Sequence, residues 1–339
     1  MPSTRPNRPS RRATAHRVAR VLTTAALAFT ALAANAQDYP VQPVRIIVPF
    51  APGGPADIYA RVIANKLQEA LGQTFVVDNR PGAGSIIGTD AVAKSAPDGY
   101  TLLLMSNTHT VNESLIPTKP FQLMRDFAPV APINSSDLVL VARTGLPATN
   151  LAELLKFAKS RPGALSYASS GPGTPYHMAG ELFKAMAGVS ILHIPYKGSS
   201  GARTDVLGGQ VDLMFDAVPT MSEHVRAGKV KALGLAGLAR SEALPGVPTI
   251  SESGAAIGLR DFDTPGWVAL YGPRGLPPLV VSRLQAAMTQ VLATPELVQR
   301  FNAAGTAPRY MDAATLDRYE QAETRKWGEA VAYSGAKAD

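Results

Sequence analysis

Short apolar runs alternate with amphipathic stretches along most of the chain. The first run, Val44 to Phe50, is nearly continuous in β-branched residues, which is typical of a strand buried on both faces of a sheet. After a Gly/Pro turn, apolar residues recur at helical spacing from Ile58 to Leu71, and we expect Gly72 to end that helix. Further strands are predicted at 74–77, 100–105, 138–142, 165–168, 191–196, 211–215 and 230–235, with helices at 86–93, 151–159, 174–186, 202–207, 221–227, 279–304 (two helices) and 314–332. This alternation predicts an α/β fold with parallel sheets.

The first 36 residues follow a different pattern. Six arginines and no acid precede an apolar run from Val21 to Ala34, and Ala34-Asn35-Ala36 follows. A basic segment, a short apolar segment and a small-residue site together indicate a secretory signal peptide cleaved near Ala36. The alternative, a membrane-anchoring helix, needs about 20 apolar residues. We therefore predict a periplasmic protein, exported by the general secretory or, as the alternative, the twin-arginine route.

Removal of this segment changes the charge of the protein. The whole chain has a formal charge of +7, and the signal peptide carries six of these charges, which leaves +1. Because no basic run survives cleavage, we expect no nucleic-acid partner. The chain has no cysteine, which excludes disulfides, thiolate catalysis and Cys-ligated zinc. The remaining 303 residues are long enough for two domains.

Motifs for the common enzymatic chemistries are missing from the sequence. We find no G-x-S-x-G elbow, no phosphate-binding G-x-x-x-x-G-K-[ST] loop and no H-E-x-x-H. The histidines after the signal peptide, at 109, 177, 193 and 224, have no metal-ligand spacing. We therefore predict a protein that is not an enzyme and needs no cofactor or metal.

Three turns at predicted strand ends could bind an anion. They are Gly53–Asp57, Ser106–His109 and Ser169–Thr174, each rich in Gly, Ser, Thr or Asn. In parallel sheets, ligands bind at the carboxyl ends of strands. Helix N-termini there attract anions through unpaired N–H groups and the helix dipole. The alternative is that each turn is an ordinary tight connection, with Asp57 and Thr174 as helix caps.

Two further residues are weaker candidates. His177 and Glu181 lie four apart on a predicted helix and therefore share a face, as a ligand contact or as a solvated pair. Asp216 follows a predicted strand, where an acid can contact a ligand or cap a helix. The sequence thus predicts these ligand-binding residues: Phe50, Gly54, Pro55, Ala56, Asp57, Ser106, Asn107, Thr108, His109, Ser169, Ser170, Gly171, Gly173, Thr174, His177 and Asp216.

The same turns, in this order, resemble a known family. The chain is similar to the periplasmic solute-binding proteins of tripartite tricarboxylate transporters, the Bug or TctC-like family. The similarity covers nearly the whole mature chain, through the segments 48–57, 79–84, 97–103, 126–130, 180–184, 193–198, 208–216 and 245–249. Pro55 after Gly-Gly, Ser85 and Ala217 depart from the pattern of many relatives, and these departures could alter the choice of ligand.

The resemblance implies a two-lobed, type II-like periplasmic-binding-protein fold, in which each lobe is a mainly parallel sheet flanked by helices. The chain would cross between lobes twice, which gives a signal peptide at 1–36, lobe 1 at 37–138 plus 258–339, and lobe 2 at 139–257. Hinge closure would capture the ligand. We expect a monomer.

The resemblance also implies a function. The protein would bind a small organic carboxylate and deliver it to the membrane permease of a tripartite tricarboxylate transporter. One alternative is a ligand-dependent partner of a periplasmic signalling sensor, and another is a periplasmic hydrolase. The sequence does not identify the carboxylate.

Overall fold

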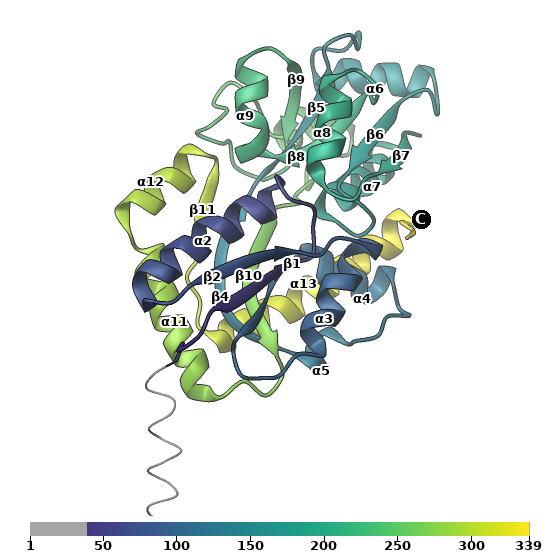
Figure 1. The fold of residues 1–339 in the computed structure, drawn as a ribbon. Coiled ribbons are helices and arrows are strands. Elements are labelled where there is room, and N and C mark those ends of the chain that lie inside the picture. Colours follow the sequence, from purple (N-terminus) through teal and green to yellow (C-terminus); the bar gives the residue numbers. More distant parts are fainter. Residues whose placement is uncertain (1–38, 339) are drawn as a thin grey trace, which may run out of the picture. The chain divides into compact units, whose positions relative to one another are not determined.

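The computed structural model describes residues 39–338, so the predicted signal peptide lies outside the described residues. From Gln42 onward these residues belong to one unit that contains two sheets. We call the six-stranded sheet with its helices lobe 1 and the five-stranded sheet with its helices lobe 2 (Figure 1). In the described part of the chain, no helix has the length and apolar character needed to cross a membrane.

Lobe 1 is built from both ends of the described chain. Its strands lie in the order β11-β4-β10-β3-β1-β2. They are β1 (Val44–Val48), β2 (Phe75–Asn79), β3 (Thr101–Ser106), β4 (Phe127–Ser136), β10 (Gly266–Pro273) and β11 (Thr306–Pro308). The helices are α2 (Pro55–Leu71), η1 (Ala83–Ser85), α3 (Ile86–Ala93), α4 (Asn107–Leu115), α5 (Leu123–Asp126), α11 (Pro278–Leu292), α12 (Pro295–Ala303) and α13 (Ala313–Ser334).

Lobe 2 uses the middle of the chain. Its strands lie in the order β7-β6-β8-β5-β9. They are β5 (Leu138–Arg143), β6 (Ser166–Ser169), β7 (Leu192–Pro195), β8 (Leu213–Ala217) and β9 (Val230–Leu235). The helices are α6 (Leu151–Ser160), α7 (Pro175–Ala187), α8 (Ser199–Leu207), α9 (Val218–Arg226), α10 (Ile250–Gly254) and η2 (Ala255–Ile257).

The α/β fold with two sheets is confirmed, but the prediction of mainly parallel sheets is wrong. In lobe 1, β1 pairs parallel with β2 and β3, whereas β10 pairs antiparallel with β3 and β4, and β11 pairs antiparallel with β4. In lobe 2, β6 is parallel to β7 and β8, whereas β5 is antiparallel to β8 and β9. The cause is the entry of the chain into each sheet: β5 and β10 each follow a passage between the lobes and begin at the cleft, whereas β3 ends there, so they run against their neighbours.

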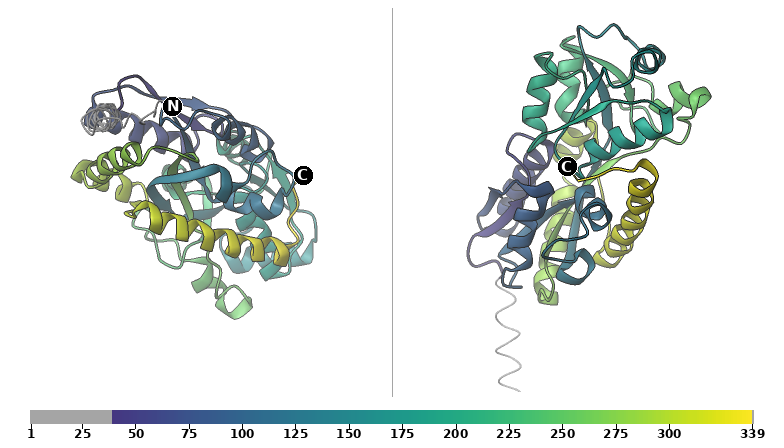
Figure 2. Two further views of the ribbon diagram at one scale, coloured as in Figure 1. Left: turned by 90° about the horizontal axis from the view of Figure 1, so that it is seen from below. Right: turned by 90° about the vertical axis from the view of Figure 1, so that its right-hand side faces the viewer.

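The two lobes are joined by two passages of chain. The first is the step from β4 to β5 at Asp137, and the second runs from the end of β9 to the start of β10. The lobes also share a small apolar cluster, in which Met178 of α7 is buried against Val111 and Leu115 of α4 and Trp327 of α13. Figures 1 and 2 show α13 running alongside α4 and reaching α7. The residue ranges predicted for the lobes remain a prediction.

Each face of the lobe 2 sheet has its own apolar core. Leu140, Phe183, Phe215 and Phe262 belong to the core on one face, and Val139, Val141 and Met214 belong to the core on the other. Because neighbouring residues of one strand serve both cores, β5 and β8 are apolar at successive positions. This burial fixes the ends of these strands, from which the site is built.

Replacing Gly180 with alanine should destabilise the protein, although alanine favours helices by about 1 kcal/mol over glycine. A Cβ at Gly180, inside α7, would lie 2.3 Å from the ring of Tyr167. Overpacking of this kind costs about 1–3 kcal/mol. Urea unfolding should therefore show a lower unfolding free energy for Gly180→Ala. Gly246→Ala is the control, since a Cβ at Gly246 meets nothing within 4 Å, and equal stability of the two variants would contradict this packing.

Candidate functional site

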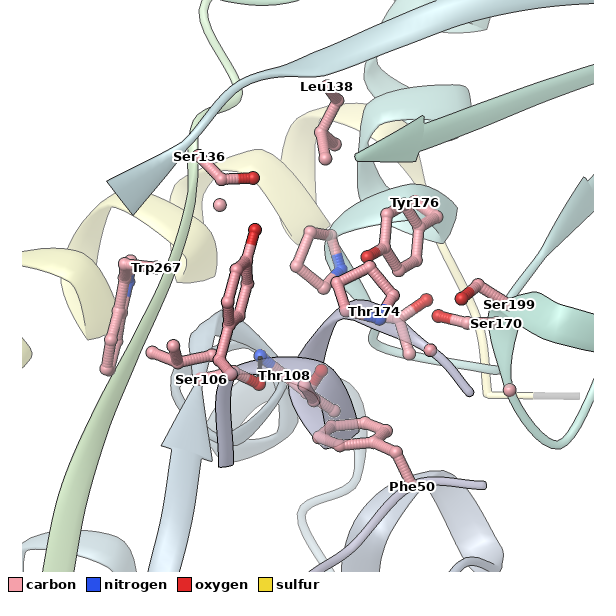
Figure 3. A pocket seen from close by; sticks show the side chains of 18 of the residues that line it. Phe50, Ser106, Thr108, Ser136, Leu138, Ser170, Thr174, Tyr176, Ser199 and Trp267 are labelled. Atoms are coloured by element: carbon pink, nitrogen blue, oxygen red, sulfur yellow. Dashed lines mark hydrogen bonds between the residues drawn. The ribbon is translucent and has the colours of Figure 1, made fainter. Parts of the chain in front are cut away.

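A cleft lies between the lobes (Figure 3). Both sheets and the helices that follow their strands contribute to its wall. The lining residues are Phe50, Ala51, Gly54, Pro55, Ala56, Tyr59, Ser106, Thr108, Asn134, Ser136, Leu138, Ser170, Thr174, Pro175, Tyr176, Gly198, Ser199, Gly266, Trp267 and Val268.

Four helices begin at this cleft. The N-cap residues of α2, α4, α7 and α8 are Gly54, Ser106, Thr174 and Gly198, and all four line the cleft. The first turn of a helix carries N–H groups without an intrahelical partner, and the helix dipole adds partial positive charge there. Two helices from each lobe thus bring this positive potential to one cavity.

The helix starts of α2 and α8 have no side-chain cap, unlike those of α4 and α7. They also approach each other closely, since a Cβ at Gly54 would lie 3.1 Å from Ser199 Oγ and one at Gly198 would lie 2.7 Å from Ala51 Cβ. In addition, Ser200 Oγ donates to the Pro52 carbonyl at 3.2 Å. Glycine at 54 and 198 lets the two uncapped ends meet across the lobes.

No ionisable acid or base lines the cleft among the described residues, apart from the tyrosines 59 and 176. The predicted contact Asp216 lies behind α8, where Arg203 Nε donates to its Oδ2 at 2.7 Å and Ala217 N donates to its Oδ1. Burial raises the pKa of Asp216, and the charge of Arg203 opposes this rise. Arg203 also lies 3.4 Å from Ser199 Oγ, so the ion pair supports the start of α8 from behind.

Asp57 has a similar supporting role at the start of α2. Its carboxylate accepts from Gly53 N at 3.0 Å and pairs with Arg61 one helical turn on. Burial alone would raise the pKa of Asp57, but hydrogen bonds from Arg61, Gly53 and Asn79 hold it below its usual value. The charge of Asp57 is therefore used to hold the 51–54 loop.

His109 shapes the start of α4 and lies outside the lining. Its Nδ1 accepts from Ser106 N at 3.1 Å, and its Nε2 lies 3.0 Å from Thr89 Oγ1. Thr89 Oγ1 donates its only hydrogen bond to the Ser85 carbonyl. Thr89 Oγ1 therefore accepts the second hydrogen bond, and the proton lies on His109 Nε2, which donates it. Burial lowers the pKa of His109 to about 4, and the hydrogen bond to the Ser106 backbone, which raises the pKa, is the smaller effect. His109 is therefore neutral at pH 7.

A second layer supports the loop before α7. Ser169 Oγ lies 2.7 Å from His193 Nε2 and accepts from Gly171 N. His177 accepts from Gly173 N through Nδ1 and stacks on His193 with ring centroids 4.2 Å apart. These side chains hold the backbone of the loop, while Ser170 and Thr174 face the cleft.

Asn107 is occupied by a network that fixes one wall of the cleft. Its Oδ1 accepts from Trp267 N at 2.8 Å, and its Nδ2 lies 3.3 Å from Glu323 Oε2. The same Glu323 oxygen accepts from the indole N–H groups of Trp267 and Trp327, each at 3.0 Å. One buried carboxylate of α13 thus holds the start of β10, including Trp267, against the start of α4.

The structure therefore divides the predicted residues into two groups. Half of them line the cleft: Phe50, Gly54, Pro55, Ala56, Ser106, Thr108, Ser170 and Thr174. The other half lie outside the lining: Asp57, Asn107, His109, Ser169, Gly171, Gly173, His177 and Asp216. The prediction missed several lining residues, chiefly Tyr59, Asn134, Ser136, Leu138, Ser199, Trp267 and Val268.

Three lining hydroxyls, those of Tyr59, Thr108 and Ser170, have no hydrogen-bond partner within the described residues. Thr108 Oγ1 and Ser170 Oγ are both buried and unpaired. Figure 3 shows Thr108, Ser170, Thr174 and Ser199 on one side of the cleft, away from Leu138 and Trp267. Within residues 39–338, no group of three or more His, Cys, Asp or Glu side chains could hold a metal ion. The site is thus suited to an anion that accepts hydrogen bonds from neutral donors.

Known proteins resemble this chain over most of its length. A family model described as "Tripartite tricarboxylate transporter family receptor" matches residues 59–335. The "UPF0065 protein in tcbD-tcbE intergenic region" of a Pseudomonas species is 40% identical over 311 residues, which are 91% of this chain and 92% of that protein. Protein BugT of Bordetella pertussis is 38% identical, over 92% of this chain and 95% of that protein.

Solved structures show the same fold. An R. palustris protein with adipate has a TM-score of 0.84 and 32% identity, over 88% of this chain and 99% of that chain. MatC from Rhodopseudomonas palustris with bound malate has a TM-score of 0.81 and 32% identity, over 86% of this chain and 100% of that chain.

The protein should lose stability as the pH falls from about 6.5 to 4, because of His109. The folded-state pKa of about 4 lies below the ordinary histidine value of 6.5, so the unfolded chain binds the proton first as the pH falls. The neutral imidazole thus makes its full contribution to the free energy of unfolding above pH 6.5. Up to about 3 kcal/mol of that free energy is lost as the pH falls towards 4. Denaturant unfolding at several pH values should show a flatter profile for His109→Gln than for the wild type. Identical slopes would contradict a buried neutral His109.

Proposed function

The chain belongs to the tripartite tricarboxylate transporter receptor family, and from this premise we propose that it is a periplasmic receptor that captures a small organic carboxylate. The observation that carries the proposal is the convergence of four helix N-termini on a cleft that no charged side chain lines among the described residues. The matched family is described as one of transporter receptors, which argues against the hydrolase alternative.

We propose that the carboxylate is held by neutral donors. The free N–H groups at the starts of α2 and α8 would supply the backbone contacts, and Thr108 and Ser170 would add hydroxyl donors. Hydrogen bonds to a charged group contribute about 1.5–3 kcal/mol each, and a helix dipole adds about 0.3–1 kcal/mol. A few such contacts are enough to hold one carboxylate without a cation.

The ligands of similar proteins agree with this chemistry. Adipate accompanies one and malate another. Both molecules are small organic acids, so a carboxylate is the ligand class that we propose here. The residues that we propose as contacts are those predicted ones that line the cleft, together with Ser199 and Gly198.

We further propose that the lobes close on the ligand about the two passages between them, and that the closed form delivers the ligand to a membrane permease. Closure is supported by the paired glycines 54 and 198, which let α2 and α8 approach each other. Delivery is supported by the family description. Loss of uptake of the ligand when the gene is deleted would test the delivery step.

The proposal predicts that the backbone N–H of Ser199 contacts the ligand, and a matched pair of variants tests this. Ser199→Ala removes the hydroxyl only. Ser199→Pro also removes the N–H, while proline suits this first position of α8. Thermal-shift screening of mono-, di- and tricarboxylates comes first, followed by calorimetry with the best ligand.

Ser199→Pro should bind this ligand roughly 10- to 100-fold more weakly than Ser199→Ala, as expected for one hydrogen bond to a charged group. Both variants should keep the unliganded melting temperature to within a few degrees. Equal affinity of the two variants would remove the Ser199 N–H from the site. If only neutral solutes raise the melting temperature, the carboxylate proposal itself is wrong.

A further inference from the structure

The wall formed by β4 contains a buried acceptor without a partner. Asn134 lines the cleft and is 1% exposed. Its Oδ1 makes no hydrogen bond within the described residues. Leaving a buried polar atom unpaired is unfavourable, so this oxygen should accept a hydrogen bond from a ligand atom or a water molecule.

The orientation of the Asn134 amide follows from its neighbours. Thr306 Oγ1 has one proton, which it donates to the Ser135 carbonyl at 2.6 Å. Thr306 must therefore accept the hydrogen bond from Asn134, whose Nδ2 lies 2.7 Å from Thr306 Oγ1. The amide nitrogen thus faces β11, and Oδ1 is left as a pure acceptor.

The Tyr59 hydroxyl is a second buried group at the same wall. It lies near the side chains of Ser136, Thr306 and Asn134. Burial raises the pKa of Tyr59, and this effect is larger than the lowering by these three neighbours. It makes no hydrogen bond of ordinary geometry within the described residues. A neutral phenol can both donate and accept. The wall therefore offers one acceptor in Asn134 and one donor in Tyr59.

We propose that Asn134 and Tyr59 select the end of the ligand that lies away from its carboxylate, and that this end is an uncharged hydroxyl group. The hydroxyl donates to Asn134 Oδ1 and accepts from the Tyr59 phenol, so that one small group satisfies both. The ligand class is then a hydroxy monocarboxylate, with its apolar body against Leu138 and Trp267. This inference rests on the proposed carboxylate site at the helix starts.

A second carboxylate fits this wall less well than a hydroxyl. A carboxylate has no proton to donate and would face Asn134 Oδ1 with like partial charge. The nearby Asp216 adds to this: burial contributes most to the raised pKa of Tyr176, and the charge of Asp216 raises this pKa by more than Arg203 lowers it. A methyl group would leave both Asn134 and Tyr59 unpaired. Of the three groups, only the hydroxyl can accept from Tyr59 and donate to Asn134 at the same time.

Matched organic acids that differ only at the far end test the proposal. Calorimetry would compare straight-chain acids of four to eight carbons ending in methyl, hydroxyl or carboxylate, and benzoate with its 4-hydroxy and 4-carboxy forms. In whichever series binds, we expect the hydroxy acid to bind at least about tenfold more tightly than the acid without the hydroxyl and than the dicarboxylate. Equal or tighter binding of the dicarboxylate would overturn the proposal.

Two variants assign the selectivity to these residues. Asn134→Leu should bring the hydroxy acid to within about threefold of the methyl acid, because the variant no longer has the acceptor for the ligand hydroxyl. Tyr59→Phe, which removes a single oxygen, should reduce the same preference and tests the proposal if Asn134→Leu does not fold. An unchanged preference in folded variants would overturn it. Failure of every acid to bind the wild type would instead refute the proposed carboxylate site.

Discussion

Unpaired backbone N–H groups at helix starts are the feature on which this site depends. Such groups can hold an anion only if the loop before each helix lets the ligand approach and if several helices converge. The α/β topology meets the second condition, because strand ends of both lobes face the cleft (Figure 3). Gly54 and Gly198 meet the condition on the loops. A side chain at either position would crowd the facing loop of the other lobe and keep the two helix starts apart.

Charged and titratable side chains serve mainly as supports behind the cleft. Asp57 holds the loop before α2, and the Arg203–Asp216 pair lies behind α8. His109 fixes the start of α4, and Glu323 joins α13 to Trp267. Each removes a charge or a polar group from the lining by pairing it elsewhere. The cleft among the described residues is therefore lined by neutral donors, and the full charge in our proposal is that of the ligand.

Sequence patterns located the helix starts but missed a wall of the cleft. Continuous apolar runs such as that of β1 and the helical spacing of α2 are strong signals, and the Gly/Ser/Thr turns after strands identified Gly54, Ser106 and Thr174. In contrast, β4 contains Pro129 and Pro132, which argue against a strand. The structure accommodates them because β11 pairs only with residues 134–136 and the pairing with β10 shifts register near both. Because β4 and β10 were missed, Asn134 and Trp267 were missed as lining residues. Periodicity also could not tell which turn side chains face the cleft. Asn107 and His177, which were predicted as ligand contacts, lie outside the lining and accept hydrogen bonds from backbone N–H groups.

A crystal structure of the protein with a bound organic acid tests the central claim most directly. Our account predicts a carboxylate oxygen within about 3 Å of backbone N–H groups at the starts of α2 and α8, with Arg203 still paired to Asp216. A carboxylate that is instead bound by Arg203 or another cationic side chain, with the helix starts left in water, would contradict it.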